Sequence, residues 1–133
     1  MGIQYKESKD FTKEDIEDLF LSVEWLSGRY PERLIKALRA SSTVITAWDG
    51  AKLIGLIRAL DDGEMTAYLH YLLVNPAYQG YGIASELLRI IKNKYKDYLY
   101  INLMPDESSN APFYQKHGFS ILEDGVAMQI KHI

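Results

Sequence analysis

The spacing of apolar residues changes along the chain, and each spacing predicts a different kind of element. Ile3–Glu7 predicts a short first strand. Apolar residues then recur every three to four positions, after Thr12, whose side-chain oxygen suits a helix start. Asp15 stands three residues later, as in a capping box, and Pro31 begins a second helical segment. The residues expected to face inward from these two helices are Ile16, Leu19, Phe20, Val23, Leu34, Ile35 and Leu38.

From residue 43 the apolar period becomes two, which predicts strands. We expect strands at residues 43–48, 52–60 and 65–74, with tight turns between them at Asp49-Gly50 and Asp61-Asp62-Gly63. A helix, a strand at 98–103 and a short helix that Asn110 caps and Gly118 closes should follow. A final antiparallel pair is expected at 119–122 and 126–130. The inward side of the long helix should carry Ile83, Leu87, Ile90, Ile91 and Tyr95.

Composition narrows the class of protein. A chain of 133 residues with 47% hydrophobic content predicts one domain, residues 1–133, with a substantial core. The net charge of −3 argues against a nucleic-acid partner. The absence of cysteine excludes disulfides and thiolate metal sites, and His117 and His132 show no ligand spacing, so we expect no metal. No signal peptide or membrane-length apolar run is visible, so we expect a cytoplasmic protein without a membrane partner.

The most informative stretch is 72–88, LLVNPAYQGYGIASELL, which reads as a strand, a glycine loop and a helix start. Helix N-termini carry unpaired N–H donors and partial positive charge, so this order suits phosphate oxygens. The dinucleotide fingerprint would need a third glycine where Ser85 stands, and the P-loop would need Gly-Lys-Ser/Thr, which is absent. A tight turn and a phosphate cradle of another type remain.

Two stretches resemble motifs of the GNAT superfamily of N-acetyltransferases. Gln79, Gly82 and Ala84 match the Gln/Arg-x-x-Gly-x-Gly/Ala loop that the superfamily uses on the pyrophosphate of acetyl-CoA. Residues 110–119 resemble its second motif, with the Phe-Tyr-x-Lys-x-Gly-Phe core intact. The resemblance implies the GNAT acyl-CoA N-acyltransferase fold, an α/β (α+β mixed sheet) domain with the order β-α-α-β-β-β-α-β-α-β-β.

The resemblance also implies acetyl-CoA as the acetyl donor and assigns residues to it. In the superfamily, the strand before the loop splays from its neighbour at a bulge, and its backbone N–H groups contact the donor and polarise the thioester oxygen. The residues that match cofactor-binding positions are Leu72, Leu73, Val74, Gln79, Gly80, Tyr81, Gly82, Ile83, Ala84, Ser85 and Asn110.

Two side chains are candidates for catalysis. Tyr114 matches the general acid of the superfamily, and a tyrosine hydroxyl, with a pKa of about 10, can protonate a departing thiolate. His70 lies in a run similar to the histidine-bearing strand of arylalkylamine acetyltransferases, which implies a relay for the amine proton. A structural, hydrogen-bonded histidine is the alternative. Tyr68, His70 and Leu72 should share one strand face until the bulge.

The acceptor is expected to be a primary amine, with a small molecule favoured over a protein. A small amine, an antibiotic amine, an amino acid and a protein terminus all stay open at this point. Glu24, Trp25 and Tyr30 lie where the superfamily places the acceptor, and Tyr68 faces the same region. Trp25 and Glu24 would suit a cationic amine with an apolar body. A packed tryptophan and a solvated carboxylate are the alternative.

Two classes of function therefore stand side by side. One is an N-acetyltransferase in which the amine attacks acetyl-CoA directly in a ternary complex, an acyltransferase without a covalent enzyme intermediate. The other is a CoA- or acyl-CoA-binding module of the same fold without significant transferase activity. Exposed strand edges would allow a homodimer with either.

Overall fold

The computed structural model describes residues 2–133, and the chain within it forms two compact units. The first ends at Leu103 and the second is Met104–Ile133. The larger unit contains the predicted sheet and three of the predicted helices, and the smaller one contains the last helix.

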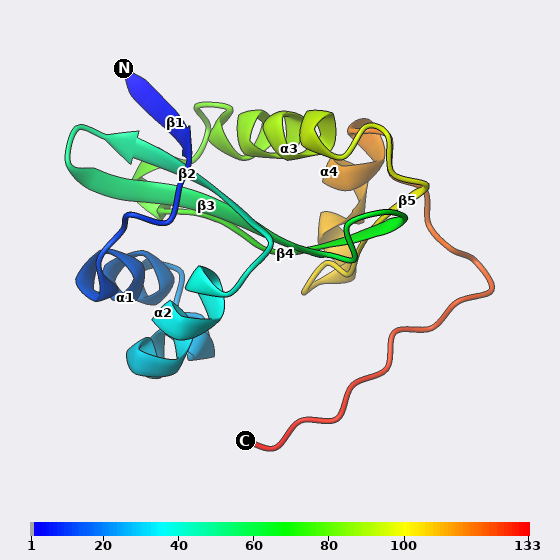
Figure 1. Ribbon diagram of the computed structural model, residues 1–133, viewed down its shortest axis with the longest axis horizontal. Helices are drawn as coiled ribbons and strands as arrows, with labels where there is room; N and C mark the ends of the chain where they lie inside the picture. Colours follow the sequence, from blue (N-terminus) through cyan, green and yellow to red (C-terminus); the bar gives the residue numbers. More distant parts are fainter. Residues whose placement is uncertain (1) are drawn as a thin grey trace. The chain divides into compact units, whose positions relative to one another are not determined.

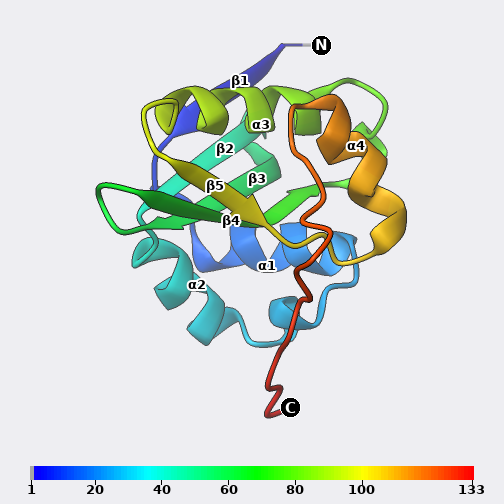
Figure 2. The same cartoon turned by 90° about the vertical axis from the view of Figure 1, so that its right-hand side faces the viewer.

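The first unit is built on a five-stranded sheet in the order β1-β2-β3-β4-β5. Neighbouring strands are antiparallel from β1 to β4, and β5 is parallel to β4. The helix α3 covers one face, and α1 and α2 cover the other (Figures 1 and 2). The elements are β1 (Ile3–Glu7), α1 (Lys13–Ser22), α2 (Pro31–Arg39), β2 (Thr43–Asp49), β3 (Lys52–Asp61), β4 (Thr66–Val74), α3 (Ile83–Lys94) and β5 (Tyr100–Leu103).

These bounds confirm the predicted elements of the first unit closely, except that β5 begins two residues late. The N–H of Tyr98 donates to the carbonyl oxygen of Tyr95 at 3.0 Å, so the turn that ends α3 uses the first residues of the expected strand. Among the described helices, none is long and apolar enough to cross a membrane.

The capping box predicted for α1 is present. The N–H of Asp15 donates to the hydroxyl oxygen of Thr12 at 3.0 Å, and the N–H of Thr12 donates to the Asp15 carboxylate at 2.9 Å. These bonds satisfy two N–H groups that a helix start leaves unpaired. The helix therefore begins at a fixed point and directs its apolar side toward the sheet.

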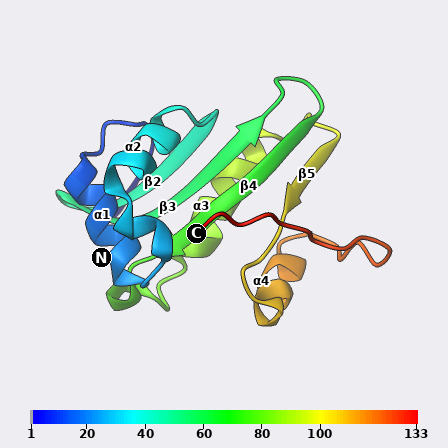
Figure 3. The ribbon, with the colours of Figure 1, turned by 90° about the horizontal axis from the view of Figure 1, so that it is seen from below.

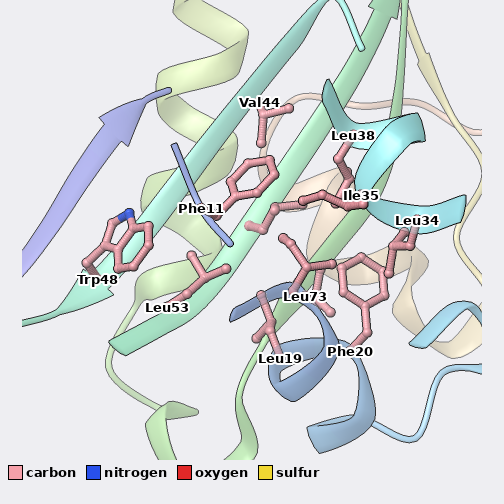
Figure 4. Close-up of a cluster of buried hydrophobic side chains, with 12 residues drawn as sticks. Phe11, Leu19, Phe20, Leu34, Ile35, Leu38, Val44, Trp48, Leu53 and Leu73 are labelled. Carbon is pink, nitrogen blue, oxygen red and sulfur yellow. The ribbon is translucent and has the colours of Figure 1, made fainter. Parts of the chain in front are cut away.

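The core between α1, α2 and the sheet is a cluster of interlocking aliphatic and aromatic side chains (Figure 4). Phe20 and Leu38 are completely buried there. Val23, Trp25 and Tyr71 pack against its border and remain partly exposed. The cluster consists of Phe11, Ile16, Leu19, Phe20, Leu34, Ile35, Leu38, Val44, Trp48, Leu53, Leu56 and Leu73.

On the opposite face, α3 is held close to the sheet at both of its ends. A Cβ at Gly55 would lie 3.3 Å from atoms of Ile83 and Leu87, so glycine allows the first turns of the helix to approach β3. At the other end the buried hydroxyl of Tyr95 donates to Asp61 at 2.6 Å and accepts from Thr43 at 2.6 Å. Burial of the Tyr95 hydroxyl raises its pKa strongly, and the hydrogen bond to Asp61 adds a smaller increase.

The second unit contains α4 (Ala111–Lys116). Gly118, with φ +94°, closes the turn that follows the helix, as its sequence predicts. Asn110 occupies the N-cap position, but its side chain makes no capping hydrogen bond, so that part of the prediction is wrong. Asn110 has helical φ and ψ and ends a short 3-10 turn, Ser108–Asn110, rather than the extended backbone that a side-chain cap needs.

The predicted final strand pair at 119–122 and 126–130 is also wrong, because residues 119–133 contain no strand. In Figure 1 this segment is drawn as a plain trace after α4. Leu122, Val126 and Met128 are 73%, 86% and 91% exposed. A two-stranded hairpin needs a surface that buries one of its faces, and these side chains are not buried against one. A turn at Gly125, whose N–H donates to Leu122 at 3.1 Å, does form.

Replacing Tyr95 with phenylalanine should destabilise the first unit. The variant Tyr95→Phe keeps the ring but leaves the buried Thr43 hydroxyl and the Asp61 carboxylate without their partner, which should lower the free energy of unfolding by about 1–3 kcal/mol. Urea unfolding monitored by circular dichroism measures this change. The matched control is Tyr100→Phe, because Tyr100 is 57% exposed. Equal stability of the two variants would show that the buried bonds contribute little.

Candidate active site

The glycine loop adopts the conformation that its sequence predicts. Gly80 and Gly82 have φ values of +88° and +76°, and Gly82 is the N-cap of α3. Nothing lies within 4 Å of where a Cβ would stand at either glycine, so the backbone there is open to an incoming group. The first bond inside the helix runs from the N–H of Glu86 to the carbonyl oxygen of Gly82 at 3.1 Å. The N–H groups of Ile83 and Ala84 therefore precede the helical ladder and have no acceptor within it.

The entry to this loop is anchored to the β2–β3 hairpin. The N–H of Asn75 donates to Ile54 at 2.8 Å, and its side chain accepts from the N–H of Ala77 at 2.9 Å. The hydroxyl of Tyr78 donates to Asp49 at 2.5 Å, and that bond, together with burial, raises the pKa of Tyr78. The loop is thus exposed, yet it is fixed at its start.

A bulge in β4 confirms the interruption that the resemblance implies. Leu56 pairs with Leu73 and Arg58 pairs with His70, so one residue of β3 faces two residues of β4. Tyr71, one of those two, has φ +62°, a left-handed conformation that is uncommon for a bulky residue. The bulge changes the phase of the strand, so Tyr71 and Leu73, rather than Leu72, lie in or beside the core under α1 and α2.

The ladder between β4 and β5 ends just before the bulge. Its last pair is Leu69 with Leu103, and β4 continues to Val74 beside β3. Figure 3 shows the two strands diverging toward this end of β5. The predicted donor-binding residues Leu72, Leu73 and Val74 therefore lie in the part of β4 that has left β5.

The bulge also gathers aromatic side chains beside α1. Tyr71 is 5.0 Å from Phe20 and 6.1 Å from Trp25 between ring centroids, and its hydroxyl shares a 2.8 Å hydrogen bond with Ser27. His70 stacks on Tyr71 at 4.0 Å. Because the bulge turns the side chain of Tyr71 to the face that His70 already occupies, consecutive residues lie on the same side of the strand.

Tyr68 completes the group, with its ring 6.1 Å from His70. The predicted sharing of one face by Tyr68 and His70 is thus confirmed, whereas Leu72, which follows the bulge, is not part of this group. We call Trp25, Tyr68, His70 and Tyr71, with Arg58, the β4 cluster.

Arg58 lies in the middle of the β4 cluster. Its guanidinium carbon is 4.6 Å from the centre of the Tyr71 ring, and Nη2 donates to Nδ1 of His70 at 2.7 Å. Nη1 donates to the hydroxyl oxygen of Ser41 at 3.3 Å. Burial lowers the pKa of Arg58, against smaller opposing effects of Tyr71 and Tyr68. An arginine has no acceptor atom, so Nδ1 of His70 is unprotonated in this contact.

The structure brings only part of the predicted acceptor site together. Trp25 lies in the β4 cluster, whereas Glu24 is exposed, in a left-handed turn with φ +58°. Tyr30 is 40% exposed, at the N-cap of α2. Sequence reasoning missed Arg58 and Tyr71. A charged residue within the apolar run 53–60 was the available signal for Arg58.

Tyr114 lies on α4 in the second unit, the same unit as Asn110. Its half-buried ring makes edge contacts with Phe113 at 5.1 Å and with Phe119 at 6.1 Å. Burial, and to a smaller extent Asp106, raises the pKa of Tyr114. The hydroxyl therefore keeps its proton at neutral pH and is able to act as a proton donor.

Comparison with known proteins identifies related sequences and folds. The model of the acetyltransferase (GNAT) family matches residues 9–119. An uncharacterised N-acetyltransferase from Prochlorococcus marinus is 31% identical over 119 residues. The match covers 84% of this chain, which spans 64% of the length of that relative.

Two solved structures are similar over nearly the whole chain. A GNAT-family acetyltransferase from Streptococcus pneumoniae has a TM-score of 0.84 and 29% identity, covering 99% of this chain and 100% of its own. A probable acetyltransferase of unknown function from Staphylococcus aureus has a TM-score of 0.86 and 25% identity, covering 98% of this chain and 100% of its own.

The contact with Arg58 predicts the tautomer of His70. At pH 8, where an unperturbed imidazole is neutral, the proton should be on Nε2 because Nδ1 accepts from Arg58. Nitrogen-15 NMR of the imidazole distinguishes the two tautomers. In Arg58→Met the Nδ1 resonance should shift, because its donor is lost. A ring that carries its proton on Nδ1 in the unsubstituted protein would contradict the described contact.

Proposed function

Because this chain belongs to the acetyltransferase (GNAT) family, we propose that it moves the acetyl group of acetyl-CoA to a primary amine. The observation that carries the proposal is the glycine loop, in which two exposed, left-handed glycines precede the start of a 12-residue helix. The chain spans 64% of the length of its curated relative, so the proposal concerns this chain and not the whole of that protein.

The loop fits the phosphate groups of acetyl-CoA. Backbone N–H donors at a helix start, with the helix dipole, are a common binding site for phosphate oxygens. Side chains at positions 80 and 82 would fill the space that such a group approaches, and glycine leaves it open. We assign Gln79 to Ser85 to the pyrophosphate, Leu72 to Val74 to the arm that carries the acetyl thioester, and Asn110 to a further donor contact.

The reaction needs three proton transfers besides the exchange of bonds. Acetyl-CoA supplies an acetyl thioester; the amine nitrogen forms the new C–N bond, and the C–S bond breaks with its electron pair remaining on sulfur. The ammonium form of the acceptor first loses one proton to water, which leaves the neutral amine that attacks. Tyr114 gives its proton to the departing sulfur, and the nitrogen loses a second proton after the attack, which returns through water to Tyr114. A backbone N–H of β4 beyond the bulge polarises the thioester oxygen. Direct attack needs no covalent enzyme intermediate.

The sequence context of His70 suggests a relay for the amine proton, but its contacts in the structure favour a structural role. Its Nδ1 lone pair is engaged by Arg58, so accepting a proton there would break a 2.7 Å hydrogen bond. This contact supports the structural alternative, in which His70 orients Arg58. A role for His70 as the amine base stays a prediction, as do a homodimer and a cytoplasmic location.

The alternative, a CoA-binding module without significant transferase activity, has less support. Such a module would need the loop but not a protonated tyrosine. The family match and the intact Phe-Tyr-x-Lys-x-Gly-Phe core, which contains Tyr114, favour an enzyme.

Acetyl-CoA should stabilise the protein against heat, and Gly82→Val should remove this effect. Binding to the folded state raises the melting temperature by mass action. A β-branched residue at φ +76° is strained and places methyl groups in the open space above the loop. Differential scanning fluorimetry with and without acetyl-CoA measures the shift.

The matched control is Gly63→Val. Gly63 has φ +84° and equally open surroundings, but it lies in the β3–β4 turn. It should suffer similar strain and keep the response to acetyl-CoA. If Gly82→Val responds like Gly63→Val, the loop does not bind the phosphates.

Removing the Tyr114 hydroxyl should slow the chemical step. Tyr114→Phe keeps the ring contacts, so acetyl-CoA binding should change little, and kcat should fall roughly ten- to a thousandfold. Release of free CoA in the presence of an amine panel measures the rate, with Tyr100→Phe as the control. A variant at full rate would show that another group protonates the thiolate.

A further inference from the structure

The guanidinium of Arg58 is a buried cation for which the described part of the chain provides no counter-ion. Arg58 is 8% exposed, and its Nε–H has no hydrogen-bond partner. The ion pairs among residues 2–133 join Lys13 to Glu32, Arg89 to Glu86 and Lys94 to Glu7, and none includes Arg58. A buried charge with an unsatisfied donor is strongly unfavourable, and binding of an ion is one of the roles that explain such a group.

The neighbours of Arg58 hold it in place without neutralising it. The hydroxyl of Ser41 donates to the carbonyl oxygen of Ala37 at 2.8 Å, so its oxygen is turned to accept from Nη1. His70 accepts from Nη2, and the ring of Tyr71 faces the guanidinium carbon. Both terminal nitrogens are therefore fixed by uncharged groups. Among the three guanidinium nitrogens, Nε is the one that makes no hydrogen bond.

The chemistry of this arrangement specifies an oxyanion. The planar fork of N–H donors on arginine matches a carboxylate, with bonds that charge on both sides strengthens. The β4 cluster contains a single cationic side chain, so one negative charge balances it, whereas a phosphate dianion would leave an excess. The rings of Trp25, Tyr68 and Tyr71 offer apolar and aromatic contact for the rest of a ligand.

We propose that Arg58 binds the carboxylate of the acetyl acceptor, which makes the acceptor an amine with a carboxylate and an apolar body, as in an amino acid. The inference rests on the proposed function, because the β4 cluster lies at the bulge that separates β4 from β5, beside the segment assigned to the thioester. Arg58 then binds the carboxylate end of the acceptor, and the amine nitrogen at the other end stays available for reaction.

The most direct experiment observes the unused donor itself. The side-chain Nε–H resonance of Arg58 is assigned by comparison with Arg58→Lys and followed by proton–nitrogen NMR during titration with phenylacetate. A parallel titration uses 2-phenylacetamide, which has the same shape without the charge. Phenylacetate should move the Arg58 resonance downfield and saturate, and the amide should not. Equal behaviour of the two probes, or no movement up to the solubility limit, would overturn the proposal.

The second experiment compares acceptors. Release of CoA from acetyl-CoA is measured with amino acids and with the amines that lack only their carboxylate, for example phenylalanine and 2-phenylethylamine. The unsubstituted protein should prefer the carboxylate member, and Arg58→Met should lose this preference by a roughly ten- to hundredfold rise in KM. Arg58→Lys should restore part of it. The control Arg33→Met replaces an exposed arginine of α2 and should keep the preference.

The outcomes separate this proposal from the function on which it rests. Acetylation of amines without a carboxylate preference, with no response of Arg58 to phenylacetate, would overturn the carboxylate site and leave the acetyltransferase intact. Binding of phenylacetate with unchanged acetyl-CoA stabilisation but no acetylation of any amine would support the site and count against the transferase. Movement of the Arg58 resonance by O-phosphoethanolamine but not by phenylacetate would overturn the choice of carboxylate.

Discussion

The bulge at Tyr71 is the constraint on which the arrangement of this protein depends. One extra residue in β4 takes the strand out of phase, ends its ladder with β5 at Leu69, and turns Tyr71 to the same side as His70. A left-handed tyrosine is costly, and strain of this kind persists only where the surroundings enforce it. Here Phe20 packs on the edge of the ring, Arg58 lies over its face, and Ser27 bonds its hydroxyl. The strain is thus maintained by the same contacts that form the β4 cluster.

The bulge connects the core to the two parts of the proposed site, which are the glycine loop with the strand before it and the β4 cluster. Beyond the bulge, Leu73 returns to the core under α1 and α2, which fixes the strand that precedes the glycine loop. At the loop, Asn75 and Tyr78 tie the chain back to β3 and to the β2–β3 hairpin. The backbone that we assign to the donor therefore continues directly from Tyr68, His70 and Tyr71, the members of the β4 cluster that lie on β4. Loosening the packing around Tyr71 would disturb both.

The sequence predicted those features that arise from local pattern. Thr12 with Asp15, the glycines of the loop and most inward residues of α1 to α3 were predicted from their spacing, because local geometry decides their structure. In α3 the prediction named Ile90, which is only partly buried, and left out Leu88, which is completely buried. Tyr71 and Arg58 were missed because their roles come from pairing between strands: a phase shift of one residue is invisible in a period-two pattern. The prediction of the last two strands was wrong for a related reason. Residues 126–130 alternate as a strand should, but a pattern cannot show whether a surface exists to cover it.

The contacts of Arg58 also indicate how selectivity and catalysis are divided in the proposed enzyme. Acetyl transfer to any amine needs only a positioned thioester and a proton donor, and neither requires a buried cation in β3. Keeping Arg58 desolvated, with Ser41 and His70 engaged, is unfavourable, and in the proposed complex a bound carboxylate offsets part of that cost. When a ligand lacks the group that pairs with a buried donor, that donor stays unpaired in the complex. Such a site therefore discriminates strongly against ligands without that group. In this proposal, Arg58 acts on the choice of acceptor and Tyr114 acts on the chemical step.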